Sequence, residues 1–330
     1  MNRRAFASLA GTLFLVCALF VPISAQAAML TGDQVNAVLG LLRAFGASDS
    51  SVAAVAAALS GQGSTGAAAT ATTTVATRPS TDGSPYLSST LGYDISYSSR
   101  NYPQMPFGFA VIGATAGKSF TRNTRLAAEF SWARLAAATA PTIYLNVNAP
   151  YGSSATTAHL SSPQTCTALF DGTTTSASAG GTFPEPTTCA AYNYGYNAAQ
   201  DAYAFTASQA NVASKLWWLD VEEENSWSPN TAVNDAVIQG AIDALNARGI
   251  RVGIYSMAYM WKNIAGAGFT PTQSLSGAAT PIATWFPIGI ATQVGATNAC
   301  LTKDSFIPGS PVWVIQYVLD SKAVDQNVAC

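Results

Sequence analysis

Short apolar runs bounded by polar or glycine-containing turns recur along most of this chain. Seven of them are apolar on both faces, a pattern typical of strands that are covered on both sides. These predicted strands lie at residues 91–96, 108–114, 142–147, 216–222, 251–256, 282–286 and 312–317.

Segments with apolar residues at helical spacing alternate with several of these strands, at residues 123–138, 197–214 and 230–249. The last has Asn230 or Thr231 as its N-cap and Gly249 as its stop. Strand alternating with helix predicts a parallel sheet covered by helices, and a length of about 245 residues fits a (β/α) barrel. Because the final 75 residues show little helical pattern, we expect an α/β, TIM-like barrel whose helices are reduced at its C-terminal end.

The residues before the barrel divide into three parts. Residues 1–27 place two arginines before an apolar stretch and end on Ala-Gln-Ala, the layout of a secretory signal peptide. Residues 28–60 predict a short helical hairpin, and residues 61–85 have the Gly, Ala, Ser and Thr composition of a linker. We therefore expect a barrel domain over residues 86–330 in a secreted or periplasmic protein, with no membrane span after the signal is removed.

Charge is scarce, which narrows the classes of function. Charged residues make up 10% of the chain and the net charge is −2. The sequence therefore shows no clustered basic residues of the kind that bind nucleic acid, and we expect no nucleic-acid partner. The single histidine, His159, argues against Ser-His-Asp and Cys-His catalytic sites and against a His-ligated zinc. If the protein is an enzyme, we expect carboxylates to carry its proton chemistry, without a cofactor or metal.

Four cysteines follow the predicted signal peptide, an even number that predicts disulfides in an exported chain. Three pairings are possible. Closeness along the chain favours one bond around an insertion and a second that clamps the C-terminus, namely Cys166 with Cys189 and Cys300 with Cys330.

That insertion, residues 148–195, is rich in Ser, Thr, Gly and Pro and is expected to be a long loop after the third strand. In a barrel such loops lie on the face where active sites are built. The loop either walls a substrate groove or has no contact with substrate, and both interpretations stay open. Three tyrosines at and just beyond its C-terminal end are expected to pack within the loop, with groove lining as the alternative: Tyr192, Tyr194 and Tyr196.

Acidic residues gather at the end of the fourth strand. Trp218, Asp220 and Glu222 share one face of it, and the two acidic Cα atoms are separated by roughly 6.6 Å. Glycoside hydrolysis commonly uses such a pair, one carboxyl as the acid and the other as nucleophile or stabiliser. Crowding of the acids should raise the pKa of one of them. Taken alone, the D-x-E motif is explained better by an ion pair or a helix cap.

Two further acids strengthen the case. Asp94 ends the first strand and Asp325 follows the last, and these strands are neighbours in a closed barrel. We therefore expect both acids to converge with Asp220 and Glu222 at one mouth. An alternative hypothesis treats the four acids as oxygen ligands for Mg²⁺ or Ca²⁺ in a different hydrolase.

Several motifs resemble, in order, those of glycoside hydrolase family 25, the lysozymes that cleave the glycan of peptidoglycan. They are "GYDIS", "FAVIGATAGKSFTRN", "WWLDVE", "VGIYS", "IQY" and "VDQN". The resemblance implies a barrel with diminished late helices. It also implies that Glu222 is the general acid/base and that Asp220 is its partner, either as nucleophile or by orienting the substrate's 2-acetamido group. By the same resemblance, Asp94 and Asp325 position the sugar and Tyr255 contacts it.

The chain also departs from the family pattern. The third strand of family 25 usually carries an aromatic-His-aromatic run, whereas "TIYLNVNAPYG" contains no histidine, so we interpret the chain as a divergent branch. Two tryptophans are candidates for stacking on sugar, Trp218 and Trp227. The leading hypothesis is an exported lysozyme-like glycosidase acting on peptidoglycan or a related N-acetylated glycan. The alternative is a non-catalytic carbohydrate-binding or cell-surface protein on the same barrel.

Overall fold

The computed structural model describes the barrel and only isolated residues before it. The described residues are 35, 39, 40, 56, 83–99, 101–103, 106–136, 139–150, 156–178, 181–210, 214–320 and 324–330. Nearly all of the predicted signal peptide, helical hairpin and linker therefore lie outside the described residues, and the boundary near residue 85 stays a prediction.

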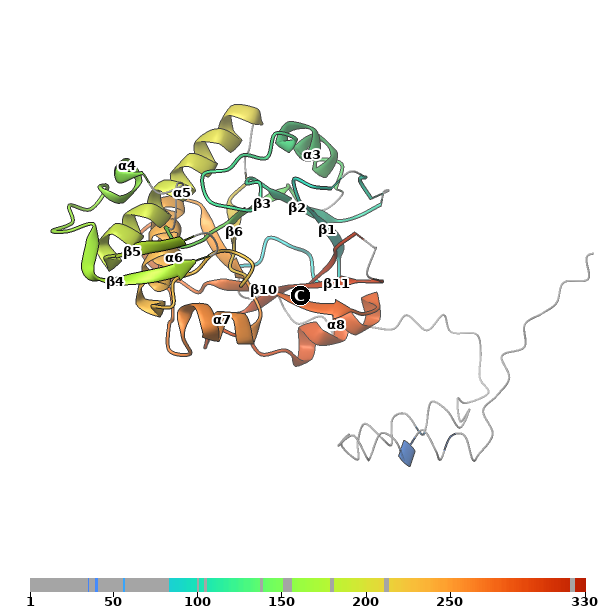
Figure 1. The fold of residues 1–330 in the computed structure, drawn as a ribbon. Helices are drawn as coiled ribbons and strands as arrows, with labels where there is room; N and C mark the ends of the chain where they lie inside the picture. The colour runs from blue at the N-terminus through green and yellow to red at the C-terminus, as the bar shows by residue number, and fades with distance from the viewer. Residues whose placement is uncertain are drawn as a thin grey trace, which may run out of the picture. The chain divides into compact units, whose positions relative to one another are not determined.

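Eight strands form a closed barrel in the order β1-β2-β3-β6-β7-β10-β11-β12 (Figure 1). All seven predicted strands are present, so the expected α/β barrel with few helices is confirmed. The strands are β1 (Leu91–Ile95), β2 (Phe109–Gly113), β3 (Thr142–Asn146), β6 (Leu216–Asp220), β7 (Arg251–Tyr255), β10 (Ala283–Ile290), β11 (Val312–Val318) and β12 (Gln326–Ala329).

The eighth strand, β12, departs from the expected parallel sheet. It lies between β11 and β1 and is antiparallel to both. Its sequence, QNVA, has no apolar run, so its extended form is set by pairing with its two neighbours. The Cys300–Cys330 disulfide ties the residue after β12 to α8 (Gln293–Thr302). The first and last predicted strands are thus joined through β12 and do not pair directly.

Helices cover the barrel unevenly (Figure 1). The long pair α5 (Thr188–Gln209) and α6 (Thr231–Asn246) lies side by side, and α3 (Leu126–Ala133) packs on β2. The Asn230 side chain caps α6 by accepting from the Ala232 amide, as predicted. The late helices α7 (Ala258–Ala265) and α8 are short, and the hairpin β8 (Gln273–Leu275) with β9 (Ala278–Thr280) lies between them in sequence. This confirms the expected reduction of helices.

The insertion is not a single long loop, so that expectation is wrong. It contains α4 (Thr157–Leu160), an antiparallel hairpin of β4 (Phe170–Ser178) and β5 (Gly181–Pro186), and the first turns of α5. The hydroxyl of Thr187 caps α5 by accepting from the Ala190 amide, so the helix begins nine residues before the segment that apolar spacing indicates. The three tyrosines accordingly lie in α5, and Tyr194 is fully buried.

Both disulfides that closeness along the chain favours are present. Cys166–Cys189 joins the segment before the β4–β5 hairpin to the first turn of α5, and Cys300–Cys330 clamps the C-terminus. Within the described part of the chain, no helix combines the length and the apolar character that a membrane span requires.

The barrel interior is filled by large rings. Alternation along β6 places Trp217 and Leu219 among the side chains under the helices, whereas Trp218 points inward and packs with Trp285 and Trp313. These inward rings are buried, so the interior is a packed core and not a channel. Within the barrel, space for a ligand therefore lies beyond the rings, at the ends of the strands.

Contact between α5 and α6 depends on two glycines. A Cβ atom on Gly195 would lie 2.0 Å from the Val237 carbonyl oxygen, and one on Gly240 would lie 2.1 Å from the Tyr192 carbonyl oxygen. The two backbones therefore touch, and neither glycine has room for a methyl group.

We predict that Gly240→Ala lowers the free energy of unfolding by about 1–3 kcal/mol, because the overpacking exceeds the gain in helix propensity. Urea unfolding measures the change. Gly268→Ala is the control, since nothing lies within 4 Å of the added Cβ atom and the stability should stay nearly constant. A Gly240→Ala protein as stable as the wild type would contradict this packing.

Candidate active site

A cavity of about 290 Å³ opens at the carboxyl ends of the parallel strands. All four acids that the sequence singles out line it, so the structure brings them together from three parts of the barrel. Asp94 comes from β1, Asp220 from the last position of β6, Glu222 from the loop that follows, and Asp325 from the residue before β12. Tyr255, at the end of β7, also lines this cavity.

The loop after β6 presents Glu222 at the rim. The Asp220 carbonyl accepts hydrogen bonds from the Val147 amide and from the Asn225 side chain. The Trp227 indole nitrogen donates to the Glu222 carbonyl over 2.7 Å. These contacts turn the chain so that Glu222 is half-buried in the cavity wall, whereas Glu223 and Glu224 are exposed.

Two amide side chains hold Asp94 in place. Its Oδ2 atom accepts from Gln316 Nε2 at 3.0 Å and from Asn327 Nδ2 at 2.8 Å. The amides are themselves oriented, because the Tyr255 hydroxyl donates to Gln316 Oε1 and the Trp285 indole donates to Asn327 Oδ1. Neither amide was predicted as a site residue from the sequence, although Gln316 lies in the motif "IQY" and Asn327 in "VDQN".

Asp220 has one held oxygen and one free oxygen. Its Oδ2 atom accepts from Asn146 Nδ2, and its Oδ1 atom is buried without a hydrogen-bond partner. Asn146 ends β3 directly beside Asp220 in the strand register and lines the cavity. Sequence analysis missed Asn146; its position at a strand end is the signal that would have found it.

Burial raises the pKa of each of the three enclosed acids. For Asp94 and Asp220 burial is the largest cause, followed by the negative charge of Asp325 near Asp94 and of Glu222 near Asp220. For Glu222 burial is again the largest cause, and the charge of Glu224 adds to it. The cavity therefore holds protons at a higher pH than free carboxyl groups do.

The expectation that Trp218 contacts sugar is wrong. Trp218 has no exposed surface, and its indole nitrogen donates to the Tyr86 hydroxyl inside the barrel. Trp218 belongs to the core because it lies two residues before the end of β6, where inward side chains fill the barrel interior. Trp227 is half-buried, and the residues that line the cavity do not include it. Trp227 packs against the hydrophobic core and donates to the Glu222 carbonyl, so it holds the loop and does not offer a stacking surface in the cavity.

Other aromatic residues do reach the cavity. Tyr97, Tyr144 and Trp285 line it, and Tyr97 is 45% exposed. Tyr97 follows Asp94 by three positions, in the turn after β1. The described residues of the insertion do not contribute to the lining, so the groove-wall interpretation gains no support from them.

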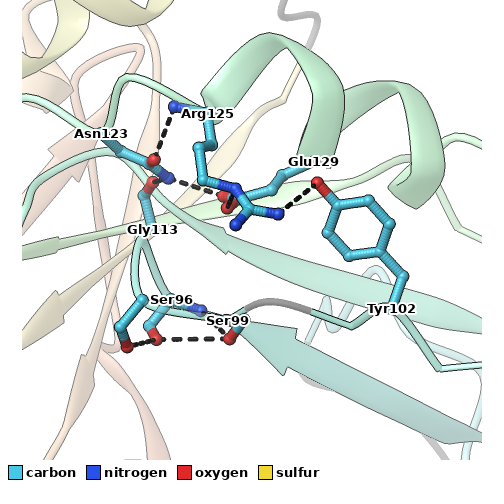
Figure 2. A network of polar contacts seen from close by, with 8 residues as sticks. Ser96, Ser99, Tyr102, Gly113, Asn123, Arg125 and Glu129 are labelled. Carbon is cyan, nitrogen blue, oxygen red and sulfur yellow. Dashed lines mark hydrogen bonds and ion pairs between the residues drawn. The ribbon is translucent and has the colours of Figure 1, made fainter.

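A polar network fixes the turns beside the mouth (Figure 2). Ser96 and Ser99 bond within the turn that carries Tyr97. Nearby, Asn123 donates to the Gly113 carbonyl and to the fully buried Glu129, which Arg125 also approaches at 3.6 Å. Because β2 ends at Gly113, this network holds the start of the β2–α3 connection, where Gly117 lines the cavity.

Among the residues that the structure describes, no three His, Cys, Asp or Glu side chains are grouped so that they would hold a metal ion. The four cavity acids are also not joined to a described cation, since the ion pairs found involve Arg122 with Asp201 and Arg125 with Glu129.

Comparison with known proteins points to one family. Residues 181–276 match the family model described as lysozyme-like protein 1. This segment contains β6, Asp220, Glu222 and Tyr255. The resemblance to lysozyme-like proteins is confirmed. A curated lysozyme-like protein 5 of Caenorhabditis elegans is 34% identical over 88 residues, which cover 27% of this chain and 39% of that protein.

Solved structures of lysozymes align over a larger part of the chain at low identity. A family GH25 lysozyme from Aspergillus fumigatus is 13% identical, with a TM-score of 0.44 over 73% of this chain and 93% of that one. A family 25 glycosyl hydrolase from Bacillus anthracis is 14% identical, with a TM-score of 0.40 over 73% of this chain and 89% of that one. The closed barrel of this chain is established by its own strand order.

We predict that the buried acids make the barrel domain less stable as the pH rises. Because the pKa of Asp220 is raised above its ordinary value of 3.8, the folded state binds more protons than the unfolded state between the two values. Its contribution is fully present below the unfolded pKa and is lost as the pH rises through the folded pKa. Asp220→Asn should therefore be more stable than the wild type at high pH, by on the order of 1–2 kcal/mol.

Urea unfolding of both proteins across a pH series measures this difference. Glu223→Gln serves as the control. Because Glu223 is exposed, the free energy of unfolding of this variant should follow that of the wild type across the pH series. A constant difference between Asp220→Asn and the wild type at every pH would contradict a raised pKa.

Proposed function

We propose that this protein is an exported, lysozyme-like glycoside hydrolase that cleaves peptidoglycan or a related N-acetylated glycan by carboxylate acid/base catalysis. The observation that carries the proposal is the convergence of Asp94, Asp220, Glu222 and Asp325 on one cavity at the barrel mouth. The match of residues 181–276 to a lysozyme-like family model supports the same class of substrate. The predicted signal peptide and two disulfides support export.

Glu222 is suited to be the general acid/base. It lies at the rim, where a glycosidic oxygen can approach, and its raised pKa keeps a proton on it at a pH where a free glutamate has lost one. Activity should accordingly decline as the pH rises through the pKa of Glu222, because the leaving oxygen then has no proton donor.

Asp220 is suited to be the partner of Glu222. Asp220 lines the cavity and its Oδ1 atom has no hydrogen-bond partner, so this carboxyl group is suited to attack the sugar or to receive the N–H of a 2-acetamido group. Either role explains why a buried carboxyl oxygen has no partner within the protein, because the substrate would supply the hydrogen-bond donor or the anomeric carbon.

The remaining residues are assigned to binding. Asp94, fixed by its two amide donors, offers its other oxygen to sugar hydroxyl groups, and exposed Asp325 lies at the edge of the cavity. Tyr97 and Tyr255 contribute ring surface and a hydroxyl group to the wall. We expect Tyr255 to contact the substrate beside Glu222.

We predict that Glu222→Gln lowers the rate of glycan cleavage by about 10²–10⁴-fold, because the amide has no proton to donate to the leaving oxygen. Purified peptidoglycan is incubated with each protein, and released fragments are identified by mass and by new reducing ends. Glu223→Gln is the matched control, and it should cleave like the wild type because its side chain points away from the cavity lining.

Equal cleavage by Glu222→Gln and the wild type would reject the assignment of Glu222. Saturable glycan binding by the wild type without new reducing ends would instead favour the alternative, a non-catalytic carbohydrate-binding protein on this barrel.

A further inference from the structure

A short chain of buried hydrogen bonds runs from β2 to Asp220. Thr115, two residues after β2, is 1% exposed, and Asn146, at the end of β3, is 8% exposed. Thr115 Oγ1 donates to Asn146 Oδ1 over 2.7 Å, and Asn146 Nδ2 donates to Asp220 Oδ2. Thr115 is not among the residues that line the cavity, so it acts on the site only through Asn146.

The hydrogen bonds of this chain run in one direction. The backbone amide of Asn146 donates to Thr115 Oγ1 over 2.9 Å, and an amide N–H has no other role. Thr115 accepts that bond and donates its single proton to Asn146 Oδ1. With Oδ1 engaged as an acceptor, the amide must turn its NH₂ group toward Asp220. That NH₂ group only donates, so Asp220 Oδ2 can only accept.

We propose that Thr115 is a positioning residue: by locking the Asn146 amide, it keeps Asp220 Oδ2 an unprotonated acceptor and leaves Asp220 Oδ1 as the oxygen that receives a donor from the substrate. The identity of that donor, the N–H of an N-acetylated sugar, rests on the proposed function. The lock itself rests on the hydrogen bonds alone.

The lock opposes the other groups that face Asp220. Glu222 and Glu224 from its own loop, Asp94 from β1, Tyr144 from β3 and Tyr255 from β7 surround it. Burial first, and then the charges of Glu222, Asp94 and Glu224, raise the pKa of Asp220 and favour its protonated form. A donor that is aimed at Oδ2 favours the ionised form and so counteracts them, as does the nearby Asn225 side chain.

Removal of the Thr115 hydroxyl tests the lock. In Thr115→Val the shape is nearly kept, but the Asn146 amide is free to turn and present its own oxygen to Asp220. An amide oxygen accepts a proton from the carboxyl group and thereby stabilises the protonated acid. Thr115→Ser keeps the hydroxyl and should behave like the wild type.

The measurement is a ¹³C NMR titration of the Asp220 carboxyl group, assigned by its absence in Asp220→Asn. We expect Thr115→Val to raise the titration midpoint by about one pH unit, which is a tenfold increase in proton affinity, and Thr115→Ser to restore it. An unchanged midpoint in Thr115→Val would overturn the proposal. If Thr115→Val does not fold, Asn146→Ala removes the same donor and must raise the midpoint for the proposal to stand.

Kinetics supply a second readout. The acidic limb of the kcat/KM profile should move to higher pH in Thr115→Val, with a lower kcat and a nearly unchanged KM, and Thr115→Ser should reverse both changes. A uniform loss of rate without a shifted profile would indicate a structural role only and would overturn the proposal. The titration does not require an active enzyme. A wild-type protein that cleaves no glycan would refute the proposed function, and the titration midpoint of Asp220 would still test the role of Thr115.

Discussion

A closed barrel needs every strand edge paired, and here the last pairing is made by the four residues of β12, between β1 and β11. That pairing places Asn327 against Asp94 and brings Asp325 to the rim. The Cys300–Cys330 bond holds the end of β12 on the barrel. Without this strand Asp94 would lose one of its two amide donors, and β1 and β11 would each expose an unpaired edge. The pairing of β12 therefore both closes the barrel and sets the positions of Asp94 and Asp325 in the cavity.

Neutral amides, and not cations, hold the buried carboxylates of the described cavity. Gln316 and Asn327 orient Asp94, and Asn146 orients Asp220. A guanidinium or ammonium group would fix the acids too, but it would also neutralise them and lower their pKa values. Amide donors set the direction of each carboxyl group and leave the cavity negative. This is the environment that a glycosidase needs if one carboxyl is to keep its proton beside an ionised partner.

The pattern of apolar and polar residues predicted those parts of the fold that depend on neighbouring residues in the sequence. The apolar runs located seven strands, and acids at strand ends located the cavity. Pairing defines β12, whose four residues carry no apolar repeat, so the sequence did not reveal it. Alternation along the strand predicted that Trp218 faces inward. It did not predict that the Trp218 indole would donate a hydrogen bond, within the core, to Tyr86, which lies outside the strands. Asn146 and Gln316 were missed because an amide at a strand end looks like any polar residue until its partner is known.

The central claim is that the cavity formed by the acids is where glycan binds and is cut. A crystal structure of Glu222→Gln soaked with a short N-acetylated glycan tests this most directly. We expect a sugar in the cavity, with its acetamido N–H or its anomeric carbon next to the carboxyl group of Asp220 and a glycosidic oxygen next to residue 222. A glycan bound on another face of the barrel, with the cavity acids untouched, would contradict it.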